Sequence, residues 1–216
     1  HDKVAVFEAK VAGLAREAGL SQCVNYGFLG RKYQSEVLGA VDAYKGAGLD
    51  LDAQPIVVKN PLSEDLDTMR VSLIPGLLKN LVHNLRHGNS SGRLFESGYV
   101  FRRGPEGYEQ DLRLALVAWG QPLDLWNKGE VAVFFDLKSR LQKILDRLLI
   151  SQVQWNPWTS PATLLHPAQA ATIFIEGRNV GFLGTVHPQW QLNEKVRVPV
   201  AVGEIDLKAL MRGQPR

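Results

Sequence analysis

The sequence NPLSEDLDTMRVSLIPGLLKNLVHNLRHG, residues 60–88, is followed after a short polar loop by RLFESGYVFRR, residues 93–103, and these two segments decide the fold class. The first segment carries two closely spaced helix starts. Ser63 can cap a helix with its side-chain oxygen, and Glu64 and Asp65 suit the positive end of the helix dipole. The pattern therefore predicts a first helix that begins at residue 63.

The second helix start lies at Ser72, with Pro75 in the first turn, where proline is tolerated. Apolar residues then recur at helical spacing on one face, and these are Ile74, Leu77, Leu78, Leu81 and Leu85. Gly88 is expected to end this helix. Residues 94–101 are rich in apolar and aromatic side chains, as in a central strand. The order is helix, loop, strand.

This segment resembles the catalytic-like module in the beta subunit of bacterial phenylalanyl-tRNA synthetase. The shared features are an Asn-Pro pair, an Arg before Ser-Leu, Pro-Gly-Leu-Leu and Leu-Phe-Glu-x-Gly. The resemblance continues in the family's order through VAVFFDLKSRLQKIL (131–145), HPAQAA (166–171), GFLGTVHP (181–188) and EIDL (204–207). It covers nearly the whole chain, and residues 31–54 match least.

The resemblance implies one module, residues 1–216, that is an excised piece of a larger beta subunit. The implied fold is α+β, a class II aminoacyl-tRNA synthetase-like antiparallel sheet flanked by helices. The residue pattern agrees. It predicts helices over 4–18 and 131–150, a strand over 23–28, a loop-rich insertion or hairpin over 29–52, a strand over 55–59, hairpins over 94–119 and 172–185, and a strand over 198–205.

Composition is that of a globular chain. Hydrophobic residues make up 45% of the 216, which excludes disorder, and no apolar run reaches the roughly 20 residues of a membrane span. The absence of a signal-peptide pattern predicts a cytoplasmic location. Cys23, the only cysteine, cannot form an internal disulfide and is expected to be a buried thiol rather than a nucleophile.

The first helix and the strand after it correspond, by the resemblance, to the first class II motif, which lies at a dimer interface. This implies that the first helix faces a partner subunit, taken to be the alpha subunit, and the apolar stripe of the helix after Ser72 is a second candidate surface. The candidate interface residues are Val4, Phe7, Val11, Leu14, Leu77, Leu81 and Leu85. An ordinary core-facing helix is the alternative, because an apolar stripe does not say which surface covers it.

The residues that the class II reaction needs are mostly absent. The strand LRLALVAWG, residues 112–120, lacks the Glu-Gly pair expected in the catalytic subunit, and Leu207 or Lys208 falls near the place of the ATP-binding arginine. Arg102 and Arg103 follow the first hairpin strand, but exposed loop cations explain them as well. No catalytic residue is therefore assigned.

No cofactor or metal site is assigned either. His166 and His187 stand about twenty residues apart without a cysteine or carboxylate at metal spacing, and are interpreted as structural. The net charge of +3 comes from 25 basic and 22 acidic residues, scattered rather than gathered into a stripe, so strong binding of nucleic acid by this chain alone is not expected.

The sequence thus predicts a non-catalytic structural domain that pairs with the catalytic alpha subunit in a heterotetramer. The parent complex would use ATP and magnesium to attach phenylalanine to its tRNA, and tRNA would be a partner of the holoenzyme only. Two alternatives stay open: a degenerate class II ATP-dependent ligase, supported only by Arg70, Arg102 and Arg103, and a freestanding tRNA-binding module.

Overall fold

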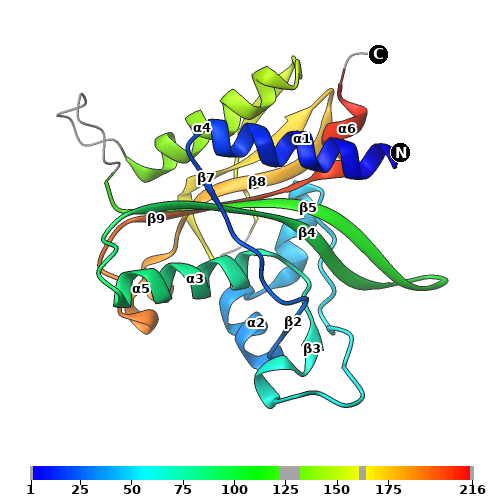
Figure 1. Cartoon of the computed structure of the whole chain (residues 1–216), viewed down its shortest axis with the longest axis vertical. Coiled ribbons are helices and arrows are strands. Elements are labelled where there is room, and N and C mark those ends of the chain that lie inside the picture. The colour runs from blue at the N-terminus through cyan, green and yellow to red at the C-terminus, as the bar shows by residue number, and fades with distance from the viewer. Residues whose placement is uncertain (1, 122–131, 161–163, 215–216) are drawn as a thin grey trace.

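The computed structural model of the chain describes residues 2–121, 132–160 and 164–214, and a seven-stranded sheet forms its centre (Figure 1). The strand order is β1-β4-β5-β9-β8-β7-β6, and every neighbouring pair is antiparallel except β1 with β4. The strands are β1 (Ser21–Gln22), β4 (Gly92–Gly104), β5 (Gly107–Trp119), β6 (Val153–Pro157), β7 (Leu165–Ile175), β8 (Arg178–Val186) and β9 (Val200–Asp206). A separate antiparallel pair joins β2 (Phe28–Leu29) to β3 (Thr68–Met69).

Helices cover both faces of this sheet (Figure 1). One face carries α1 (Lys3–Glu17), α4 (Val133–Arg147) and α6 (Leu207–Arg212), and the other carries α2 (Arg31–Leu38), α3 (Ile74–Arg86), α5 (Pro188–Glu194) and the 3-10 helix η1 (Val41–Ala47). Each face has its own hydrophobic cluster. Along β5, Leu114 and Leu116 enter the first cluster, whereas Ala115 and Val117 enter the second. This explains the unbroken apolar run of β5, since side chains on both of its faces are buried.

The fold confirms the predicted α+β class and most of the predicted elements. Asp2 caps α1 by accepting a hydrogen bond from the backbone N–H of Val4, and Gly88, at φ +88°, follows the end of α3. The hairpin β4–β5 is longer than predicted, because the two strands pair out to Gly104 and Gly107. No helix among the described residues is long and apolar enough to cross a membrane.

Four local predictions were wrong. The helix expected at Ser63 is the single 3-10 turn η2 (Glu64–Leu66), and Ser63 makes no side-chain cap. Residues 23–28 form a strand only at their last position, in β2. The expected loop-rich insertion over 29–52 contains helix α2 and the 3-10 helix η1. The expected strand over 55–59 is reduced to one bridge, between Val57 and Thr68.

The residues predicted to contact a partner subunit lie in the two internal clusters. Five of them are buried, namely Phe7, Val11, Leu14, Leu77 and Leu81. Val4 and Leu85 are partly buried and pack against the same clusters. These side chains contact their own chain, because the apolar stripes of α1 and α3 cover the sheet.

Candidate functional site

The motifs that carried the family resemblance converge on one buried site, formed by β4, β5, β9 and the start of α3. Across the strands the register aligns Glu96 with Ala115 and Ala115 with Glu204, so that the two carboxylates lie on the same sheet face. We call the polar side chains gathered here, Arg70, Ser72, Glu96, Arg113 and Glu204, the ionic cluster. All five are buried.

Arg70 and Glu96 form the first half of the ionic cluster. Arg70 donates from Nη1 to Glu96 Oε1 at 2.6 Å and from Nε to the carbonyl of Tyr99 at 2.8 Å. Gly98 makes room for this guanidinium, since a Cβ at Gly98 would lie 2.4 Å from Arg70 Nη2. The side chains are 8% and 3% exposed, so this is a desolvated pair whose charges depend on each other.

Glu204 forms the second half and is fully buried. Its Oε2 accepts a hydrogen bond from Ser72 Oγ at 2.5 Å, and its Oε1 accepts the backbone N–H of Leu73 at 3.2 Å. Ser72 Oγ in turn accepts the N–H of Ile74, two residues further on. Helix α3 nevertheless begins at Ile74 with Leu73 as its N-cap, which makes no side-chain cap, so the helix start lies slightly later than the sequence indicated. Burial raises the pKa of the Glu204 carboxyl above its ordinary value, although the Arg113 charge and these hydrogen bonds act in the opposite direction.

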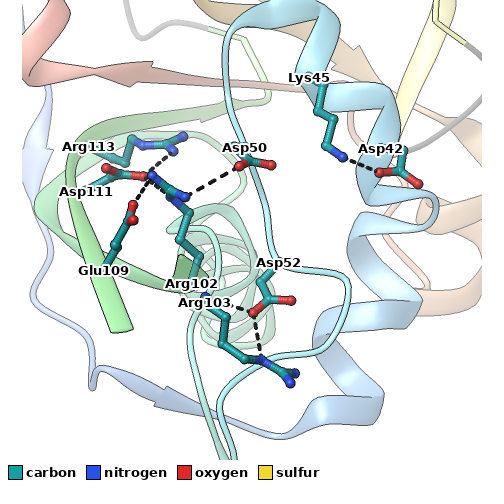
Figure 2. A network of polar contacts seen from close by, with 9 residues as sticks. All are labelled: Asp42, Lys45, Asp50, Asp52, Arg102, Arg103, Glu109, Asp111 and Arg113. Carbon is teal, nitrogen blue, oxygen red and sulfur yellow. Dashed lines mark hydrogen bonds and ion pairs between the residues drawn. The ribbon is translucent and has the colours of Figure 1, made fainter. Parts of the chain in front are cut away.

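Arg113 links the ionic cluster to a second network near the free end of the hairpin (Figure 2). Its Nη2 donates to Asp111 Oδ2 at 3.2 Å, whereas its Nε and Nη1 have no hydrogen-bond partner among the described residues. Arg102 donates from Nε to the same Asp111 oxygen at 3.1 Å and also pairs with Asp50 and Glu109. The hairpin is thereby fastened to the segment that follows η1.

Arg103 completes this second network. It donates to Asp52 Oδ2 from its backbone N–H at 3.0 Å and from Nε at 3.3 Å (Figure 2). It also donates from Nη2 to the backbone carbonyl of Gln54. The three arginines that supported a ligase, Arg70, Arg102 and Arg103, are therefore each paired with carboxylates of the chain itself. A triphosphate would have to displace those carboxylates before it could bind.

The segment between α1 and β2 runs along the edge of this site and alternates between inward and outward residues. Asn25 donates to Glu96 twice, from its backbone N–H to Oε1 at 3.2 Å and from Nδ2 to Oε2 at 2.7 Å. Gly76 leaves space for the Asn25 side chain, because a Cβ there would lie 3.3 Å from Nδ2. Backbone hydrogen bonds hold the segment on either side of Asn25. The N–H of Cys23 donates to the carbonyl of Phe95, and the carbonyl of Gly27 accepts from the backbone N–H of Arg70.

The outward residues of the same segment are apolar and exposed. Val24 is 88% exposed, Tyr26 77% and Phe28 39%. We call these three residues the apolar strip. Burial of the inward thiol raises the pKa of Cys23, which is only half-buried rather than the fully buried residue expected from the sequence. The ionic cluster thus holds a row of uncovered apolar side chains at the sheet edge.

The charged side chains of these two networks are mostly paired with one another. Among the described residues, no three His, Cys, Asp or Glu side chains are grouped so that they could hold a metal ion. The arginines that could neutralise a triphosphate already neutralise carboxylates. What the site can do is fix the relative positions of β4, β9, α3 and the apolar strip.

The comparisons with known proteins follow this geometry. A family model described as the phenylalanyl tRNA synthetase beta chain CLM domain matches residues 1–207. The chain belongs to this family. It is 40% identical to a phenylalanine–tRNA ligase beta subunit from Bdellovibrio bacteriovorus over 100% of the chain and 27% of that protein, and 39% identical to one from Pseudomonas syringae over 74% of the chain and 20% of that protein. The chain thus spans about a quarter of the length of the curated relatives it matches.

Solved structures confirm the predicted fold. A pyrrolysyl tRNA synthetase from Desulfitobacterium hafniense superimposes with a TM-score of 0.71 over 98% of this chain and 68% of that chain, at 13% identity. A likeness at this identity shows the fold alone. The seven-stranded sheet flanked by helices is accordingly the sheet of a class II synthetase-like fold.

The sequence reasoning identified some of the site and missed the rest. Arg70, Ser72, Glu96 and Gly98 stand in the quoted motifs, but no role was assigned to Glu96 or Glu204. The apolar strip was also missed. A sequence pattern could have revealed it, because the apolar residues at 24, 26 and 28 alternate with Cys23, Asn25 and Gly27, which is typical of an extended segment with one apolar face.

Proposed function

We propose that the chain is a non-catalytic structural module of a phenylalanine–tRNA ligase beta subunit that pairs with the catalytic alpha subunit. Membership in the family supports the first half of this proposal. The ion pairs of Arg70, Arg102 and Arg103 support its non-catalytic character, because internal carboxylates hold the arginines that a triphosphate would need. In this reading ATP, magnesium and tRNA are bound by other parts of a cytoplasmic heterotetramer.

The observation that carries the pairing is the apolar strip. The side chains of Val24, Tyr26 and Phe28 are exposed in this chain. The backbone that carries them is nevertheless held in place, because Asn25 donates two hydrogen bonds to Glu96. A contiguous row of exposed apolar side chains, including an aromatic pair, is typical of a surface that binds another protein. A separate exposed apolar side chain, Val6, lies on the outer face of α1 and is 59% exposed.

The test is complex formation with the alpha subunit, measured by size exclusion with light scattering. Val24→Asp and Tyr26→Asp place a charge in the proposed interface and are expected to weaken the complex at least about tenfold, because a buried unpaired charge costs more than 1.4 kcal/mol. Leu192→Asp is the matched control, since Leu192 is 73% exposed on α5, away from the strip.

Each outcome has a separate meaning. If the two strip variants keep native circular dichroism and still elute with the alpha subunit as the control does, the strip is not the interface. Val6→Asp then shows whether the outer face of α1 is the contact surface instead. Phe7→Asp and Val11→Asp are unsuitable for this purpose, because a charge in the internal cluster would unfold the chain.

The two alternatives predict binding by the isolated chain. A degenerate ligase would bind ATP in calorimetry, and a tRNA-binding module would bind tRNA with submicromolar affinity at physiological salt. We expect neither, because the arginines are paired and the net charge is only +3.

A further inference from the structure

We propose that His83 and His87 form a binding site for a divalent transition-metal ion such as Cu²⁺, Ni²⁺ or Zn²⁺. The two residues stand four positions apart near the C-terminal end of α3, so they lie on the same side of the helix. Both are exposed, and their ring centroids are 4.2 Å apart. Two nitrogens that share one Zn²⁺, each about 2.0–2.1 Å from it, stand roughly 3 Å apart, and rotation of the two exposed side chains is needed to turn their nitrogens toward one ion.

The hydrogen bonding of His87 leaves the correct nitrogen free. Its Nδ1 lies 2.8 Å from the backbone carbonyl of His83. A carbonyl can only accept, so Nδ1 carries the proton and donates it. In the neutral ring Nε2 is then a free lone pair, and an imidazole whose other nitrogen donates to a carbonyl is the usual form of a metal-binding histidine.

The second pair of neighbouring histidines shows the opposite arrangement. His166 and His187 have ring centroids 6.2 Å apart, but in each of them Nδ1 accepts a backbone N–H, from Ala168 at 3.2 Å and from Gln189 at 3.1 Å. Nε2 must carry the proton in both neutral rings. These residues cannot offer a free Nε2 without losing their hydrogen bonds, so they serve as an internal comparison for the pair on α3.

The surroundings of the α3 pair allow a cation to approach. Lys79, one turn before His83, points toward α2, where its Nζ lies 4.5 Å from the centroid of the Tyr33 ring. The ring of His83 makes no hydrogen bond within the described part of the chain, and Asn84 uses its side chain for Asn80 and Asn89. The ion would therefore take two ligands from the protein and the rest from water. Copper should bind most tightly, following the general order for nitrogen ligands.

The experiment is calorimetric titration of this chain with CuCl₂, NiCl₂ and ZnCl₂ in a buffer that does not bind metals. We expect one ion per chain, with Cu²⁺ tightest. His83→Gln and His87→Gln should each weaken binding at least about tenfold, because a single remaining ligand loses the advantage of chelation. Electron paramagnetic resonance of the Cu²⁺ form should show coupling to two imidazole nitrogens in the wild type and to one in either variant.

His166→Gln is the control and should leave both readouts unchanged. The proposal is overturned if His83→Gln and His87→Gln keep wild-type affinity, or if His166→Gln weakens binding as much as they do. Binding with no preference for Cu²⁺ and no coupled imidazole nitrogen would also overturn it. Because the pair lies outside the apolar strip, none of these results bears on pairing with the alpha subunit.

Discussion

Removing Arg70 should cost more stability than removing any surface cation. In Arg70→Met the Glu96 carboxylate stays buried but loses the guanidinium 2.6 Å away, and the carbonyl of Tyr99 loses its donor. Asn25 still donates to Glu96, so part of its hydrogen bonding survives. Breaking a buried ion pair on one side costs about 3–5 kcal/mol. We expect the free energy of unfolding to fall by that amount.

Urea unfolding followed by tryptophan fluorescence measures this loss. With a slope of about 2–3 kcal/mol per molar urea, the midpoint should fall by about 1–2.5 M. Arg147→Met is the control: Arg147 and its partner Glu17 are 70% and 62% exposed, and an exposed pair contributes about 0–1 kcal/mol. Adding Glu96→Gln to Arg70→Met removes the stranded charge and should recover about 1–3 kcal/mol. The reasoning is refuted if Arg70→Met lowers the midpoint no more than Arg147→Met, or if the second substitution recovers nothing.

Three further predictions concern other positions. Burial raises the pKa of Glu204 above its ordinary value of 4.5, so the folded state binds this proton more tightly than the unfolded state does. The protonated carboxyl therefore contributes its full stabilisation of the fold below pH 4.5, and this contribution is lost as the pH rises through the raised pKa. Glu204→Gln should therefore flatten this decline of the unfolding free energy, measured by urea titrations at a series of pH values upward from 4.5, and an unchanged slope would contradict it. Gly48→Ala should destabilise the chain by about 2–3 kcal/mol, since Gly48 has φ +76° and a Cβ would lie 2.2 Å from the carbonyl oxygen of Asn179, and thermal unfolding would show it. Gly13→Ala, with open space around it in α1, should instead stabilise the chain by about 0.5–1 kcal/mol, and a loss there would show that the outer face of α1 is more crowded than it is in this structure.

The sequence alone could predict elements whose hydrogen bonds are local or regular. Helix α4 and hairpin β7–β8 follow from periodicity and from the turn at Gly177, which has φ +75°. Residues 23–27 were different. Their hydrogen bonds go to a single strand carbonyl, to the Glu96 side chain and to Arg70, so the segment is extended without belonging to a ladder. No local sequence pattern reveals such partners, because all of them lie more than forty residues away along the chain.

The glycines of residues 29–52 were misread because glycine has two uses. They suggested loops, yet Gly30 precedes α2, Gly39 ends it, and Gly48 ends η1 with a positive φ. A helix flanked so closely by glycines resembles a loop when only composition is considered. The interface residues stay a prediction for a related reason, since an apolar stripe shows that a helix face is covered but does not show which surface covers it.

The motifs could be recognised before they could be explained. Positions 98 and 76 suit glycine because the side chains of Arg70 and Asn25 occupy the space where a Cβ would lie. Position 96 suits glutamate because both of those side chains donate hydrogen bonds to its carboxylate. These reasons join residues from four separate segments. Only the assembled structure brings them together.

The way the apolar strip is fastened also determines when it becomes ordered. All 13 residues of β4 pair with β5 across a tight turn, so the hairpin closes through local contacts, whereas Asn25 reaches Glu96 across a separation of 71 residues. The strip should therefore assemble late during folding and open before the rest of the sheet. Amide hydrogen exchange should be fast at residues 23–27 and slow in β5. If the alpha subunit covers the strip, its binding should slow exchange at residues 23–27 while leaving β5 unchanged, which would make this edge a part of the beta subunit that becomes firmly folded only within the complex.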